Sequence, residues 1–294
     1  MLIINTPPFS RFILVAAFIL SACSYLPQGQ TNDKKIIEQV NRIFTVLEQP
    51  KQDSIQTVNE QAEKLWIRRP GEERGERKDL PISHEQQQTI NEALTELGLI
   101  KEIYPQAEKY DAVLVLGCRA HGMLNRLDFA LKLKEKNISL GQLFILAGER
   151  QLGDMDRLST LKIPNAFETM PRKTEIDIAR IFLAMKNSQL KGLNASVTKT
   201  PAPQGRSRPD TEDTVRQWLA DNKDRKETNL LVISNQPNIP YQDVVVKKIL
   251  QPLGYSIETV GPAIDHDLSM FDRLNALHMW LKFGPASLSP DSHP

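Results

Sequence analysis

The segment Ala112-Val113-Leu114-Val115-Leu116, followed by Gly117, decides the fold that the sequence predicts. It is apolar at every position, and strands that are apolar on both faces belong in a sheet covered by helices on both sides. Further strands are predicted at 143–147, 230–233 and 255–260, with a weaker one at 195–198. Helical patterns separate these strands, and such alternation predicts right-handed parallel crossovers. The predicted fold class is therefore α/β, a Rossmann-like three-layer sandwich with a mostly parallel sheet.

Apolar residues at helical spacing predict the helices. They are expected over residues 83–97, 123–136, 174–186, 211–222, 241–250 and 268–281. Ser83 with Glu85 and Gln86 in the first turn is typical of a helix start. Further upstream, Ile36, Val40 and Phe44 begin a second amphipathic pattern, which predicts a helical arm over 34–66, broken at Pro50.

These patterns divide the chain into four parts. Residues 1–22 read as a lipoprotein signal peptide. Residues 23–82 comprise a polar tether (24–33), the helical arm and a charged linker (68–81). Residues 83–282 form the predicted α/β domain. The Pro- and Ser-rich residues 283–294 are expected to be a disordered tail.

The N-terminus has the features of a bacterial export signal. Arg11 precedes an apolar run over 12–20, which ends in Leu20-Ser21-Ala22-Cys23, the pattern of a lipoprotein box. The alternative is an uncleaved anchor, but a membrane span needs about 20 apolar residues. We therefore expect acylated Cys23 to tether the protein to a membrane on the periplasmic side. Ser24, where an acidic residue would retain a lipoprotein in the inner membrane, favours the outer membrane.

Composition argues against nucleic-acid binding and against an intrachain disulfide. The chain has 37 basic and 36 acidic residues, so no basic surface for nucleic acid is expected. Its two cysteines are Cys23 and Cys118, and lipid would consume the first. No intrachain disulfide is then possible in the mature protein.

Ligands of an open parallel sheet bind beyond the carboxyl ends of its strands. That rule selects the loops 117–122, 148–150, 200–212, 234–238 and 261–266. The residues that we expect to bind a ligand there are Gly117, Arg119, Gly122, Arg126, Gly148, Glu149, Ser234, Asn235 and Asn238.

The first of these loops resembles no standard nucleotide motif. Gly117 and Gly122 have the spacing of a Walker A loop, but Met123-Leu124 stands where Lys-Ser/Thr is required. The loop could instead present backbone N–H groups to an anion at a helix N-terminus, with Arg119 and Arg126 adding charge. The alternative is a tight turn that merely needs glycines.

Candidates for catalysis and metal binding are few. Cys118 and His121 have the spacing of half a metal site, but the matching half is absent, so no metal is expected. Cys118 is either a nucleophile or a small buried apolar residue. Glu175 and Glu212, each in the first turn of a predicted helix, are the acid–base candidates; the alternative is that each complements a helix dipole.

Several motifs together resemble the SanA/YdcF-like family, a group of α/β domains of poorly defined function from bacterial envelopes and cytoplasm. Their order along residues 110–262 carries the resemblance: the strand before Gly117, the helix from Arg126, Ile145–Glu149, Thr174-Glu175, Glu212-Asp213, and Leu231–Asn235 followed by Asn238-Ile239-Pro240. This chain has Asn238 and Tyr241 where the family has His and Arg.

Two functions follow as expectations. The first, which the resemblance implies, is an envelope-integrity lipoprotein that binds a small polar or anionic ligand and either turns it over or only binds it. The second is a non-catalytic structural lipoprotein of an envelope or secretion complex. Its apolar stripe within residues 34–66 would then dock on a protein partner.

Overall fold

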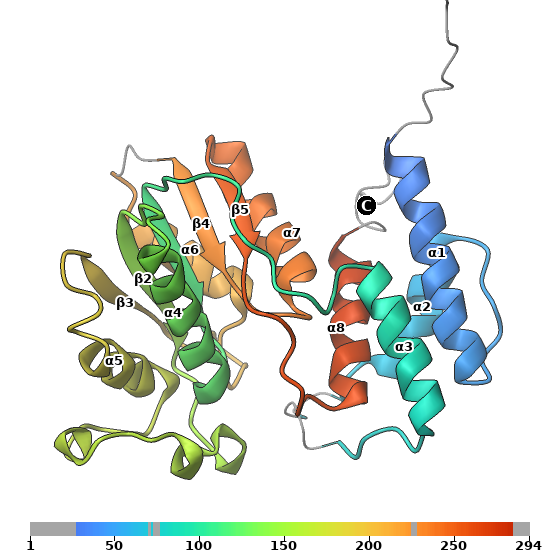
Figure 1. Ribbon diagram of the computed structural model, residues 1–294, viewed down its shortest axis with the longest axis horizontal. Helices are drawn as coiled ribbons and strands as arrows, with labels where there is room; N and C mark the ends of the chain where they lie inside the picture. The colour runs from blue at the N-terminus through green and yellow to red at the C-terminus, as the bar shows by residue number, and fades with distance from the viewer. Residues whose placement is uncertain (1–27, 70–71, 73–76, 225–227, 285–294) are drawn as a thin grey trace, which may run out of the picture.

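The computed structural model describes residues 28–69, 72, 77–224 and 228–284 (Figure 1). The predicted signal peptide, Cys23 and residues 285–294 of the predicted tail lie outside the described residues. Of the tether expected over 24–33, residues 28–33 belong to the first helix, which begins at Gln28, and residues 24–27 lie outside the described residues.

The predicted sheet is confirmed as five parallel strands in the order β3-β2-β1-β4-β5. The strands are β1 (Ala112–Leu116), β2 (Gln142–Gly148), β3 (Ala195–Thr200), β4 (Asn229–Ile233) and β5 (Ser256–Val260). Every residue of β1 is buried, as its unbroken apolar run predicts. β1 pairs with β2 on one side and β4 on the other, so the direction of sheet growth reverses between β1 and β4.

Helices cover both faces of this sheet, which gives the expected three layers. Val113 and Val115 face the side where α4 (Ala120–Glu135) and α5 (Glu175–Met185) pack. Alternate residues of the same strand, Leu114 among them, face α6 (Thr211–Asp221) and α7 (Ile239–Leu250). This alternation follows from the two-residue period of a strand. We call the strands with α4 to α7 the sheet lobe.

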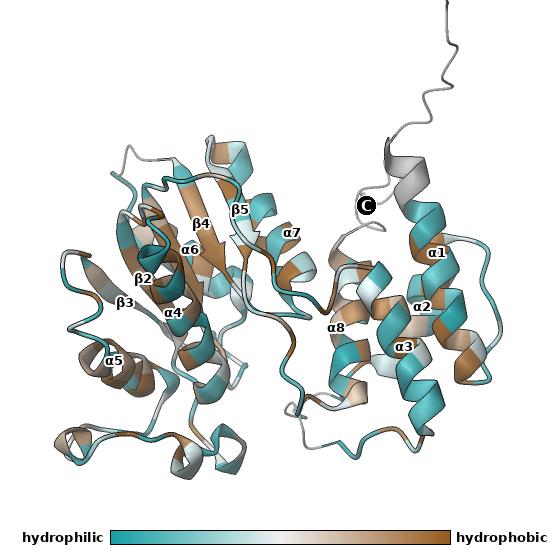
Figure 2. Cartoon of the chain, in the orientation of Figure 1, coloured by the Kyte–Doolittle hydropathy of each residue, from teal (hydrophilic) through white to brown (hydrophobic). Residues whose placement is uncertain are grey.

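Four further helices form a second hydrophobic core. They are α1 (Gln28–Val46), α2 (Ile55–Trp66), α3 (His84–Glu96) and α8 (Met270–Phe283), here called the helical lobe (Figure 1). Fully buried side chains from all four helices meet there: Ile43 and Phe44, Val58 and Trp66, Ile90 and Leu94, and Leu274 and Leu277. Hydrophobic residues accordingly lie along the inner faces of the helices and on the central strands (Figure 2).

The helical lobe differs from the predicted division of the chain. Residues 83–97 and 268–281 were expected within the sheet domain, and both contain helices, but α3 packs on α1, and α8 packs on α2 as well as on α7 of the sheet lobe. An amphipathic pattern predicts that a helix has an apolar face, but it does not say which surface covers that face. The stripe of the arm, expected to meet a protein partner, is buried by α3 and α8 of the same chain.

Two connecting segments, 97–111 and 261–269, cross between the lobes side by side (Figure 1). Ile103 and Gly261 exchange backbone hydrogen bonds of 3.0 and 3.1 Å, and the N–H of Ile264 donates to the carbonyl of Ile100 at 2.9 Å. The side-chain Nε2 of Gln236, which lies beyond β4, donates to the backbone carbonyls of Gly98 and Lys101. The connections are therefore held to one another and to the sheet. Among the described residues, no helix combines the length and apolarity needed to cross a membrane.

Because α8 closes the core of the helical lobe, Leu277→Ala should lower the free energy of unfolding by about 2–5 kcal/mol, the usual cost of a cavity at a buried leucine. Leu277 is fully buried. The measurement is urea unfolding of the full chain in detergent. Leu253→Ala is the matched control, because Leu253 is 56% exposed and should change stability little. Equal losses for the two variants would contradict the assigned core.

Candidate functional site

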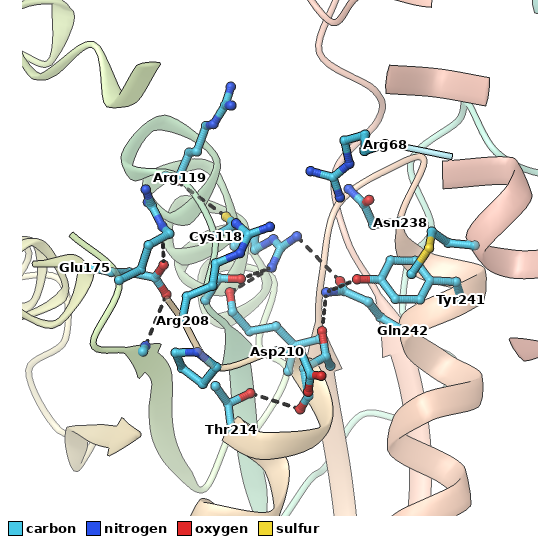
Figure 3. Close-up of a pocket in the computed structure, with 18 residues that line it drawn as sticks. Arg68, Cys118, Arg119, Glu175, Arg208, Asp210, Thr214, Asn238, Tyr241 and Gln242 are labelled. Carbon is cyan, nitrogen blue, oxygen red and sulfur yellow. Dashed lines mark hydrogen bonds and ion pairs between the residues drawn. The ribbon is translucent and has the colours of Figure 1, made fainter. Parts of the chain in front are cut away.

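A pocket of about 260 Å³ lies beyond the carboxyl ends of β1 and β2, beside the point where the strand order reverses (Figure 3). This is where open α/β sheets bind ligands. Both lobes contribute to its lining, since Arg68 follows α2 and Met279 belongs to α8. Five arginines line it: Arg68, Arg119, Arg126, Arg150 and Arg208.

Arg126 is the most buried of these arginines, with 1% of its surface exposed. Its Nη1 donates to the carbonyls of Leu116 and Gly117 at 2.8 and 3.1 Å. Its Nε and Nη2 donate to Oδ1 of Asn235, and Nη2 lies 3.5 Å from Oε1 of Gln242. All of these acceptors are neutral. No carboxylate accepts a hydrogen bond from Arg126, and the nearby Glu175 carboxylate, which interacts with its charge, is itself paired with Arg150. The Arg126 guanidinium therefore favours a further anion nearby.

Arg150, in contrast, is held by two carboxylates. Its Nη1 and Nη2 donate to Asp156 at 2.9 and 2.7 Å, and its Nε donates to Oε2 of Glu175 at 3.1 Å. Burial acts to raise the pKa of Asp156, but the hydrogen bonds from Arg150, Gly153 and Ala120 outweigh it and hold the pKa below its usual value. This ion network fixes the wall of the pocket next to β2.

Asp156 also occupies the start of α4. Its Oδ1 accepts the backbone N–H of Ala120 at 3.2 Å. The sequence left open whether N–H groups at this helix N-terminus bind an anion or the glycines only form a tight turn; in the structure a carboxylate of the chain itself accepts the N–H of Ala120. Nothing in the sequence pointed to Asp156, because it lies in a short 3-10 turn (Asp154–Asp156) without any apolar period.

Glu175 is buried against two glycines. Its Oε1 accepts the N–H of Gly148 at 3.3 Å. A Cβ on Gly117 would lie 2.2 Å from the same oxygen, and a Cβ on Gly148 would lie 2.3 Å from Cγ of Pro209. Both positions therefore need glycine because the chain approaches them closely. Burial raises the pKa of the Glu175 carboxyl, while Arg150 and the Gly148 amide oppose that rise.

A hydrogen-bonded chain follows β4 along the opposite side of the pocket. The Ser234 hydroxyl and the Gln242 side-chain oxygen form a short hydrogen bond. The Nε2 of Gln242 donates to Oγ1 of Thr211 at 3.1 Å and lies 3.4 Å from the hydroxyl of Tyr241. The Gln242 side chain thus contacts both the guanidinium of Arg126 and the hydroxyl of Tyr241 on α7.

The predicted site residues fall into two groups. Those that line the pocket are Gly117, Arg119, Arg126, Gly148, Glu175 and Asn238. Those outside the lining are Gly122, Glu149, Ser234, Asn235 and Glu212. Asn235 and Ser234 still contact lining residues, because Asn235 accepts hydrogen bonds from Arg126 and Ser234 is hydrogen-bonded to Gln242.

Glu212, expected to act as an acid or base with Glu175, points elsewhere. It forms an ion pair of 2.8 Å with Arg216, and both side chains are about half exposed. The first turn of α6 contributes Thr211 and Thr214 to the lining instead, with its N-cap Asp210. A helix places consecutive residues about 100° apart, so a shift of one or two positions changes which side chain faces the site.

Several lining residues had no individual prediction. Arg150, Arg208 and Asp210 lie in loops that the strand-end rule had selected, and Tyr241 and Gln242 begin the helix after β4. Arg68 could not have been found in this way, because it reaches the pocket from the helical lobe, where its Nε donates to Asn275 at 3.0 Å.

Cys118 lines the pocket, and its thiol lies 3.4 Å from the carbonyl of Arg119. His121 is exposed on α4 and does not line the pocket, so the two residues do not form one site. Within the described part of the chain, no group of three or more His, Cys, Asp or Glu side chains is placed to hold a metal ion.

Fold and pocket together define a class: a Rossmann-like α/β protein with an arginine-lined pocket at the switch point of its sheet. The chain is similar to proteins described as uncharacterized from Mycobacterium bovis and Mycobacterium tuberculosis, each 24% identical over 196 residues. The similarity covers 58% of this chain and 55% of each relative, so the chain spans about half the length of the curated relatives it matches. No family model and no solved structure matches it.

The ion network of Arg150 makes stability depend on pH. The pKa of folded Asp156 lies below its usual value, so its ion pair stabilises the fold above about pH 4, the unfolded value, and is lost as the pH falls through the folded value. Asp156→Asn should therefore lower the Tm between pH 5 and pH 7, with the difference from wild type shrinking toward pH 3. Asp154→Asn, at an exposed position in the same turn, is the control. A deficit that stays constant down to pH 3 would contradict this assignment.

Proposed function

We propose that this protein binds a small anionic ligand in the arginine-lined pocket, as the periplasm-facing domain of a lipid-anchored envelope protein. The observation that carries the proposal is the buried guanidinium of Arg126, whose hydrogen-bond acceptors are all neutral. An anion beside it would offset the cost of that buried charge.

The other charged residues of the lining also favour a negatively charged ligand. Two carboxylates line the pocket, and both already have cationic partners: Glu175 is paired with Arg150, and Asp210 is paired with Arg206 at 2.7 Å. Arg119 and Arg208 approach the cavity from two other segments of the chain. The planar guanidinium, with its fork of donors, suits phosphate and carboxylate oxygens better than an ammonium group does.

Glu175 is better placed to position Arg150 than to transfer protons. Its two oxygens are engaged by Arg150 and by the N–H of Gly148. A general acid or base must be free to exchange a proton with the substrate. We therefore favour a binding protein over an enzyme, and keep Glu175 as the acid–base candidate if a reaction is found.

The lipid anchor and the envelope role rest on the sequence. The lipoprotein box ending at Cys23 and the resemblance to the SanA/YdcF-like family support them. Docking to a protein through residues 34–66 is less favoured, because the required apolar stripe is buried within the helical lobe.

The ligand proposal is tested by thermal unfolding of the full chain in detergent with phosphate, pyrophosphate, sulfate and citrate. An anion that binds at about 100 times its Kd should add about 2.7 kcal/mol of stability and raise the Tm. Arg208→Ala should weaken this shift by removing a guanidinium from the lining.

Arg216→Ala is the control for Arg208→Ala, since Arg216 is an exposed arginine paired with Glu212 outside the pocket. It should keep the full shift. If no anion raises the Tm of the wild type, or if the two variants respond alike, the anion-binding proposal fails.

The anchor is tested by labelling the chain with radioactive palmitate in a bacterial host. The wild type should incorporate the label and partition into the detergent phase, and Cys23→Ser should do neither. Cys118→Ser should behave as the wild type, because Cys118 lies beside the pocket of the folded domain. Label on Cys23→Ser would contradict acylation at this position.

A further inference from the structure

The pocket has an apolar wall opposite its basic one. Tyr241 from α7 and Met279 from α8 line the same cavity as the arginines. Figure 3 shows Arg119, Arg208 and Glu175 on one side, and Tyr241 with Arg68, Asn238 and Gln242 on the other. The cavity therefore joins a strongly cationic side to a side on which an aromatic ring and a methionine lie beside a single arginine.

Tyr241 is held in place on two sides. Its ring lies 6.4 Å from the ring of Phe283, tilted by 34°, and its hydroxyl is 3.4 Å from Nε2 of Gln242. The Oε1 of the same Gln242 side chain faces Arg126. One amide thus sets the position of the aromatic ring relative to the buried cation, so the spacing of the two ends is built into the fold.

The size of the cavity limits the ligand. A volume of about 260 Å³ is many times the roughly 10–15 Å³ that one water needs on the same measure, so a bare tetrahedral anion would leave most of it unfilled. Pockets for drug-sized ligands begin near 300 Å³, so the part of the ligand that the pocket holds is smaller than a dinucleotide. A single anionic group with one compact ring matches this volume.

We propose that the ligand is a phosphate monoester of a compact aromatic or apolar alcohol. This rests on the anion-binding function proposed above. The phosphate would lie among Arg119, Arg126 and Arg208, which come from the turn after β1, from α4 and from the loop before α6. Arg119 and Arg208 would donate to the phosphate oxygens, whereas Arg126, whose five N–H groups already donate to other atoms of the chain, would contribute its positive charge. Guanidinium groups from different directions suit a tetrahedral group with three free oxygens, whereas a planar carboxylate is satisfied by one bidentate arginine.

The organic group would lie against Tyr241 and Met279. An aromatic ring can stack on a tyrosine or meet it edge to face, and a methionine sulfur makes favourable contacts with rings. Because Met279 and Arg68 belong to the helical lobe and Tyr241 to the sheet lobe, the ester would touch both lobes at once.

The test is calorimetric titration of the full chain in detergent with inorganic phosphate, phenyl phosphate and benzoate. Phenyl phosphate should bind at least about tenfold more tightly than inorganic phosphate, because the ring leaves water. It should also bind more tightly than benzoate. Equal affinities for the two phosphates would overturn the ester assignment while leaving anion binding intact, whereas no binding of any anion, here or in the thermal series, would overturn both.

Variants of Tyr241 and Met279 test whether these two residues cause the preference for phenyl phosphate. Tyr241→Ala and Met279→Ala should each reduce, severalfold, the ratio of the affinity for phenyl phosphate to the affinity for inorganic phosphate, because only the ester reaches this wall. Tyr241→Phe keeps the ring and should keep the preference. A preference unchanged in both alanine variants would overturn the proposed orientation. The wild-type comparison stands by itself should either variant fail to fold.

Discussion

One guanidinium ties the carboxyl ends of the two central strands together. Arg126 extends from α4 to the last carbonyl of β1 and to Asn235, two residues beyond β4. β1 and β4 are the neighbours between which the crossovers change faces, so their ends diverge and leave a crevice. The Arg126 guanidinium fills this crevice, and its hydrogen bonds to both strand ends hold them next to each other. Under the function proposed above, its charge would favour an anion at this place.

The helical lobe completes this arrangement. A Rossmann-like sheet alone would leave the crevice open on the side of α7. Here the segment after α2 brings Arg68 over the opening, and α8 brings Met279 beside Tyr241. The lobe is itself a small bundle whose capping boxes at Ser54 and Ser83 fix the starts of α2 and α3. Two lining residues of the pocket, Arg68 and Met279, are therefore positioned by the core of the helical lobe, which contains no strand of the sheet.

Much of the fold could be predicted because its signals are local. The buried run at 112–116 and its relatives gave all five strands, and capping residues placed several helix starts within a few positions. The packing partners of α3 and α8 could not be predicted, because the patterns of the two cores are alike. In the candidate site, four of the five loops that the strand-end rule selected contribute to the pocket lining, and 261–266 does not. The predicted residues Arg126 and Glu175, which lie in α4 and α5, line it as well. The sequence analysis missed Asp156 and Arg68, which reach the site through tertiary contacts alone, and it chose Glu212 where the helix turns another side chain inward.

The helical lobe is assembled from opposite ends of the chain, since α1 and α2 share their core with α8. Synthesis and any export of the chain proceed from the N-terminus. Until α8 has been synthesised, Phe44 and Trp66 lack the residues of α8 that share their core, and part of their hydrophobic surface stays exposed. The core of the helical lobe can therefore be completed only after the last helix of the described chain has been synthesised.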